Sequence, residues 1–136
     1  MENVCIINLA KVKCLIYRSI DLQVAKLPDS VLTKIFTLQR RIIECIDATT
    51  ALEFRLLEQW GETAETLPEL EELQTIGERL LLPYSRLHTL LLKASKSQPF
   101  ASDDMLNLLY RSIETGEANL AASTASLQEI QRNWNY

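Results

Sequence analysis

The stretch VLTKIFTLQRRIIECIDATTALEFRLLEQW, residues 31–60, decides the fold that this sequence predicts. Its apolar and small side chains recur at alternating steps of three and four, at Ile35, Leu38, Ile42, Cys45, Thr49, Leu52 and Leu56. This spacing is typical of the buried seam of a helix that packs in a bundle. Because neither Pro nor Gly lies between Asp29 and Gly61, the stretch is predicted to form one helix, about 45 Å long at a rise of about 1.5 Å per residue.

The apolar stripe on this helix is broader than the seam alone. It is widened by Leu32, Phe36, Ile43, Ile46 and Leu57, while charged residues fall on the other side. A stripe of this width indicates contact with more than one neighbouring helix. We therefore expect the rest of the chain to pack around residues 31–60.

Toward the N-terminus, residues 4–26 form the first predicted helix. Their apolar side chains also recur in steps of three or four, and Pro28 ends the pattern. Residues 4–7 are rich in β-branched side chains, so a strand is the alternative there. Asp29 or Ser30 is expected to cap the helix that follows.

Toward the C-terminus, two more helices are predicted, over residues 68–95 and 103–133. The seam of the first continues in phase through a proline, at Leu70, Leu73, Gly77, Leu80, Tyr84, Leu87, Leu91 and Ala94. One helix with a kink near Pro83 is therefore expected, and a break at Leu82 is the alternative. Ser102 is expected to cap the last helix.

Four long helices with short links predict an all-α fold: an antiparallel up-down-up-down four-helix bundle, forming a single domain over residues 1–136. The residues expected to be almost fully buried are Leu38, Ile42, Leu52, Leu80, Leu87, Leu109, Ile113 and Leu120. Folding the third and fourth helices against each other places Gly77 opposite Ala121 and Pro83 level with Gly116. These small residues predict a close approach of the two helices.

Composition narrows the class of protein. Hydrophobic residues make up 47% of the chain and the formal net charge is −4. A globular protein is therefore expected, and neither nucleic acid nor a membrane is predicted as a partner. No signal peptide and no apolar run long enough to span a membrane are found. The odd cysteine count, with Cys5, Cys14 and Cys45, indicates reduced thiols in the cytoplasm.

The sequence offers little catalytic chemistry. His88 is the only histidine, which excludes metal sites that need two histidines and leaves one base for any nucleophile. The scattered glycines cannot form a phosphate-binding loop. The acidic run of residues 62–72 is typical of a solvated helix start. We expect no catalytic residue, no metal and no cofactor, so the chain is predicted not to be an enzyme.

One short stretch resembles the motif of a known family. HTLLLKAS, residues 88–95, is similar to the His-x-Leu-Lys-Gly-Ser motif of histidine phosphotransfer domains, small helical bundles with one exposed histidine. The lysine lies five residues after His88 rather than three, and Ala94 stands where the family has glycine. The resemblance implies a histidine phosphotransfer protein using His88 as an alternative function, and a surface histidine is the simpler interpretation.

Unequal helix lengths predict where a partner would bind. Folding residues 4–26 back along the next helix brings Val4 level with Leu52, so the second helix extends about two turns further. The uncovered end carries eight candidate partner-binding residues: Phe54, Leu57, Trp60, Leu67, Leu70, Ile130, Trp134 and Tyr136. Trp and Tyr are typical anchors of protein interfaces. The alternative is that these side chains only close the end of the core, or that residues 1–3 fold over them.

The function predicted from these patterns is that of a non-catalytic protein–protein interaction module, an intracellular adaptor, regulator or dedicated chaperone. Its partner is expected to be another protein. A structural homodimer, formed through the broad face of residues 31–60, is a further alternative.

Overall fold

The computed structural model describes residues 27–97 and 101–136 of this chain. Over these residues it consists of three long helices, α2 (Asp29–Trp60), α3 (Leu67–Lys96) and α4 (Asp103–Asn133), without a strand. These bounds lie within two residues of the ranges predicted for the second, third and fourth helices. The first predicted helix, over residues 4–26, lies outside the described residues, as does the alternative strand over residues 4–7.

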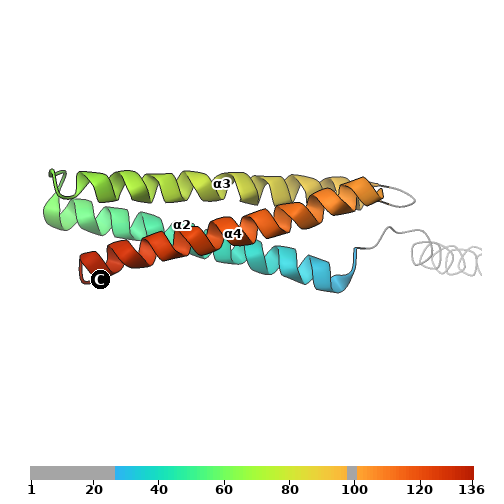
Figure 1. Ribbon diagram of the computed structural model, residues 1–136, viewed down its shortest axis with the longest axis horizontal. Helices are drawn as coiled ribbons and strands as arrows, with labels where there is room; N and C mark the ends of the chain where they lie inside the picture. Colours follow the sequence, from blue (N-terminus) through green and yellow to red (C-terminus); the bar gives the residue numbers. More distant parts are fainter. Residues whose placement is uncertain (1–26, 98–100) are drawn as a thin grey trace, which may run out of the picture.

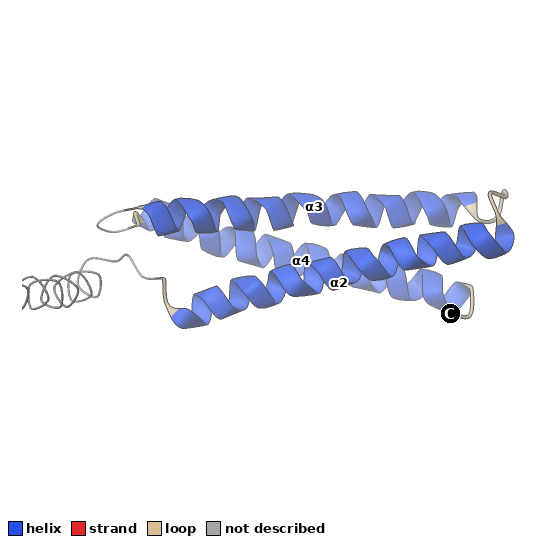
Figure 2. Ribbon diagram, turned by 180° about the vertical axis from the view of Figure 1, so that it is seen from behind, coloured by secondary structure: helices blue, strands red, loops and turns tan. Residues whose placement is uncertain are grey.

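The three helices form an antiparallel bundle (Figures 1 and 2). α2 and α4 run in the same direction, α3 runs in the opposite one, and α4 crosses α2 at an angle in both views. Each helix packs against both of the others. The predicted four-helix bundle is therefore wrong, because the described part of the chain is a bundle of three helices. Three seams facing one axis already bury one another, and part of the broad stripe on α2 is left outside, with Phe36 57% and Ile43 51% exposed.

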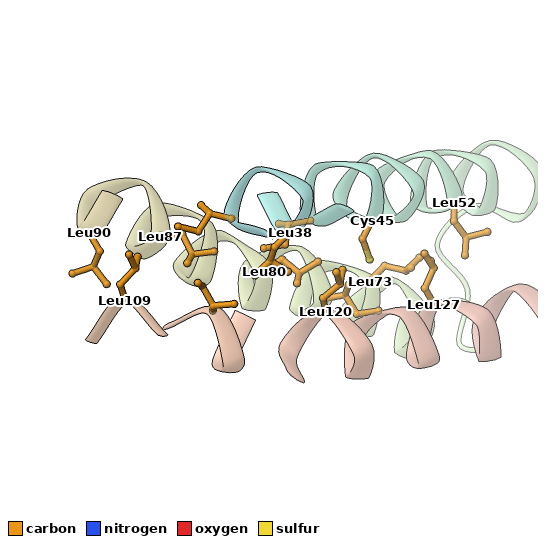
Figure 3. Close-up of a cluster of buried hydrophobic side chains, with 14 of the residues drawn as sticks. Leu38, Cys45, Leu52, Leu73, Leu80, Leu87, Leu90, Leu109, Leu120 and Leu127 are labelled. Atoms are coloured by element: carbon orange, nitrogen blue, oxygen red, sulfur yellow. The ribbon is translucent and has the colours of Figure 1, made fainter. Parts of the chain in front are cut away.

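One continuous hydrophobic core runs along the axis of the bundle. All eight residues predicted to be almost fully buried are buried, and none is more than 2% exposed. All seven seam residues predicted on α2 are buried as well. Figure 3 shows Leu90 of α3 and Leu109 of α4 facing each other, with Leu38 of α2 close to Leu80. Apolar burial of this kind, at about 25 cal/mol per Å² removed from water, is the main force that holds the helices together.

The inward face of α3 differs from the predicted seam. Ile76, Pro83 and Leu90 are buried, whereas the predicted Gly77, Tyr84 and Leu91 are only half-buried. α3 is continuous through Pro83, so the alternative of a break at Leu82 is wrong. The ribbon of α3 runs straight in Figure 1, without the kink that was expected. Pro83 is followed by Tyr84, and Leu90 is followed by Leu91. In both pairs the first residue is buried and the second is only half-buried.

Pro83 packs against a glycine on α4. A Cβ atom added to Gly116 would lie 3.7 Å from Cβ of Pro83 and 3.1 Å from Cδ2 of Leu38. Gly116 therefore provides the room in which the proline ring is buried, and the predicted level contact between the two residues is present. The predicted contact of Gly77 with Ala121 is absent, because nothing lies within 4 Å of a Cβ at Gly77 and Ala121 is exposed.

Single residues mark the ends of the helices. The Oγ of Ser102 accepts a hydrogen bond from the Met105 amide at 3.2 Å, as expected for the cap of α4. The N-cap of α2 is Pro28, without a side-chain bond, rather than Asp29 or Ser30. Gly61 ends α2 with a positive φ of 67°, a conformation that glycine adopts at little cost.

The link between α2 and α3 is organised by one buried hydroxyl. Thr66 is fully buried, and its Oγ1 donates to the carbonyl of Gly61 at 2.7 Å. The same oxygen accepts from the amide of Thr63 at 2.8 Å. The turn is therefore closed by its own hydrogen bonds, which fixes where α3 starts relative to the end of α2.

Candidate functional site

The predicted partner-binding residues lie at one end of the bundle, where α2 ends, α3 begins and the chain terminates (Figure 1). α2 contributes Phe54, Leu57 and Trp60, α3 contributes Leu67 and Leu70, and α4 with its tail contributes Ile130, Trp134 and Tyr136. Two of them belong to the core, since Leu70 is 7% and Ile130 is 3% exposed. These two side chains offer no surface to a partner.

The remaining residues form an exposed apolar surface. Trp60 is 59% exposed, Leu67 46%, Leu57 39% and Tyr136 38%, and Trp134 is half-buried. We call these five residues the end patch. Phe54 is also exposed, but it lies further round α2 from the buried face, as the 3.6-residue period requires. Most of an interface's binding energy comes from a few such aromatic anchors.

The two tryptophans contact each other across the end of the bundle. Their ring centroids are 5.8 Å apart with an interplanar angle of 60°, an edge-to-face arrangement. Such pairs are favoured because the positive edge of one ring meets the negative face of the other. The Nε1 of Trp134 also donates to Oε1 of Glu69 on α3, at the long distance of 3.5 Å. Trp134 thus joins α2, α3 and α4.

The last residues of the chain turn back onto α2. Asn135 has a positive φ of 57°, which asparagine tolerates better than most residues, and the amide of Tyr136 donates to the carbonyl of Gln131 at 2.9 Å. The Tyr136 hydroxyl then hydrogen-bonds Oε1 of Gln59. The guanidinium of Arg55 lies 5.9 Å from the centre of the tyrosine ring. Polar contacts therefore hold Tyr136 against α2, as the hydrogen bond to Glu69 holds Trp134 against α3.

Sequence reasoning missed the polar partners of this site. Arg55, Gln59 and Glu69 orient the aromatic rings, and no sequence motif marked them. Their positions alone could have indicated a shared role, since Arg55 and Gln59 lie four residues apart on the same helix face. The asparagine after a helix end is a known signal for a left-handed residue and could have indicated the turn.

The other candidate residues do not gather into a catalytic site. His88 is exposed on α3, while Cys45 is buried in the seam of α2 and forms no disulfide within the described part of the chain. Within residues 27–97 and 101–136, no group of His, Cys, Asp and Glu side chains is arranged to hold a metal ion. The described helices also contain none that is long and apolar enough to cross a membrane.

Comparison with known proteins adds no information to this geometry. No family model, no curated protein and no solved structure matches the chain. The function must therefore be argued from the surface itself.

Proposed function

We propose that this protein is a non-catalytic protein–protein interaction module, an adaptor, regulator or dedicated chaperone, whose partner protein docks on the end patch. One observation supports this most directly. Trp60 is 59% exposed, yet its ring packs in an edge-to-face arrangement against Trp134, which itself donates a hydrogen bond to Glu69. A large aromatic side chain that is both exposed and ordered loses little conformational entropy on binding.

The experiment compares partner recovery by two alanine variants of the full chain. Trp60→Ala removes the anchor, while Phe36→Ala removes an aromatic side chain of similar exposure, 57%, elsewhere on α2. A partner bound at the end patch is lost from the Trp60 variant and retained by the Phe36 variant, with the helical circular-dichroism signal unchanged in both. Equal loss in both variants, or equal retention, would reject the end patch as the docking site.

Exposed His88 keeps the histidine phosphotransfer function as a second candidate. A phosphoryl group can reach an imidazole only if the ring is accessible. Incubation with a phosphorylated response regulator would place acid-labile phosphate on the native chain and none on His88→Gln. The structural homodimer stays a third candidate, and light scattering over a range of protein concentrations tests it.

We also propose a cytoplasmic location, on the odd number of cysteines in the sequence. Neither nucleic acid nor a membrane is proposed as a partner, because the chain carries a net charge of −4.

A further inference from the structure

A second feature lies away from the end patch, on the outer side of the α3–α4 interface. A groove of about 500 Å³ lies there, with Leu82, Pro83 and Leu108 as its apolar lining. Arg79 and Arg86 extend along it from α3, and Arg111 faces them from α4. An adjoining hollow continues along α3 as far as Lys93. The groove is therefore both apolar and basic, in a chain whose net charge is negative.

The positive charges in this groove are not balanced from within the protein. Glu78 is the only carboxylate in its lining, against Arg79, Arg86 and Arg111. Among the residues that the structure describes, none of these three guanidiniums has a carboxylate within ion-pair distance. Together with Lys93, the three arginines give four basic side chains on one surface, with Glu78 as the single carboxylate in the groove lining.

The other two helix interfaces are bridged by polar pairs. Lys34 of α2 lies 3.7 Å from Glu117 of α4, and Gln74 of α3 donates to Glu53 of α2 at 3.1 Å. Along the basic groove, by contrast, arginines line both helices, and like charges repel one another. Because Pro83 is level with Gly116, the antiparallel register brings Arg86 and Arg111 to nearly the same height on facing helices. A bound anion would remove this repulsion.

The spacing of the charges indicates the shape of the ligand. Arg79, Arg86 and Lys93 recur in steps of seven on one flank of α3, and Leu82, 71% exposed, lies between the first two. Basic residues at this interval match carboxylates at the same interval on a partner helix, as in the flanking charge pairs of coiled coils. Guanidiniums also bind carboxylates through two parallel hydrogen bonds.

We propose that the basic groove binds an acidic amphipathic helix of another protein, with glutamate or aspartate in steps of seven and leucines against Leu82 and Leu108. The N-terminal segment of the same chain is a poor occupant, because its charged residues include Lys11, Lys13 and Arg18. This second docking surface does not depend on the end patch. One module could then hold two partners at once.

The test measures the binding of synthetic helical peptides of about three heptads to the full chain by fluorescence anisotropy. One set carries glutamates in steps of seven, with leucines in each alternative register, and a matched set carries lysine at every glutamate position. We expect a glutamate peptide to bind and the lysine peptides not to bind. The affinity should fall at least about tenfold between about 50 and 500 mM salt, since the contacts are charged and exposed.

Two charge-reversal variants locate the binding. Arg86→Glu alters the groove, and Arg41→Glu makes the same charge change at an exposed position of α2. We expect at least about tenfold weaker binding to the first and less than about twofold to the second. A peptide with lysine in place of the glutamate that faces position 86 should regain affinity for Arg86→Glu, which a merely misfolded variant would not show.

Several results would overturn the proposal. They are equal binding of glutamate and lysine peptides, no binding by any glutamate peptide, or equal weakening by the Arg41 and Arg86 variants. Displacement of the peptide by millimolar inorganic phosphate alone would indicate a site for small anions instead. Concentration-dependent dimerisation that Arg86→Glu abolishes would indicate a second copy of this chain as the occupant.

Discussion

Gly77 on α3 and Gly116 on α4 stand in opposite surroundings, although both are small residues within long helices. A Cβ at Gly77 meets nothing within 4 Å, whereas one at Gly116 meets Leu38, Leu87 and Pro83. We predict that Gly77→Ala raises the free energy of unfolding by about 0.5–1 kcal/mol, because alanine favours the helix. Gly116→Leu should lower it by about 1–3 kcal/mol through overpacking.

Chemical denaturation of the two glycine variants provides the check, and each is the control for the other. If Gly116→Leu left the free energy of unfolding unchanged, the side chains around position 116 would have to move aside without cost. If Gly77→Ala lowered the free energy of unfolding, another part of the chain would have to contact position 77.

Ser123 carries a hydroxyl that is fully buried and has no hydrogen-bond partner among the residues that the structure describes. A buried polar group without a partner loses its hydration and gains nothing, so Ser123→Ala should raise the unfolding free energy by about 1 kcal/mol or more. Ser112→Ala is the matched control, because the Ser112 hydroxyl donates to the Leu108 carbonyl at 2.8 Å. Both changes improve helix propensity equally. A larger increase in unfolding free energy for Ser123→Ala than for Ser112→Ala would therefore measure the cost of the unpaired hydroxyl. An equal gain would contradict this account.

At the scale of the residue, the sequence predicts burial well where one apolar residue per turn faces inward. Leu38, Leu52 and Leu120 are examples. It fails on α3, where Pro83 and Tyr84, or Leu90 and Leu91, are equally apolar neighbours. Only contact with Gly116 and the facing leucines decides that Pro83 and Leu90 turn inward, and that is a tertiary effect.

At the scale of the element, α3 presents a sharp contrast between adjacent leucines. Leu80 is fully buried, while Leu81 is 56% exposed. Leu80→Ala should lower the free energy of unfolding by about 2–5 kcal/mol, because it leaves a cavity in the core. Leu81→Ala should change it by less than about 0.5 kcal/mol, as for ordinary surface substitutions. Similar losses in the two variants, measured by urea unfolding, would mean that the face of α3 is misplaced.

Most helix bounds were predictable because the sequence carries strong start and stop signals near them. Gly61 ends α2, Pro68 lies in the first turn of α3 and Ser102 caps α4. The arginines of the basic groove were not recognised, since residues spaced by seven on α3 face α4 only once the bundle is assembled. Charge balance across an interface cannot be counted before the interface is known.

At the scale of the whole molecule, the predicted bundle had four helices, whereas the described part of the chain forms a bundle of three. Each seam indicates that a helix has partners, but it does not state how many helices share the core. In the structure the seams of α2, α3 and α4 bury one another. The prediction that follows is that a chain of residues 27–136 folds by itself. It should keep a cooperative thermal transition by circular dichroism, and a broad, non-cooperative transition would show that residues 1–26 are required.

The contact between Trp60 and Trp134 has a spectroscopic consequence. These are the two tryptophans of the chain, so all of its indole emission originates from one end of the bundle. Fluorescence therefore reports on that end alone, whereas the far-ultraviolet signal averages over α2, α3 and α4 along their whole lengths. Fraying of the end would shift the emission before the helical signal changes, and a protein bound there would alter the spectrum without any added dye.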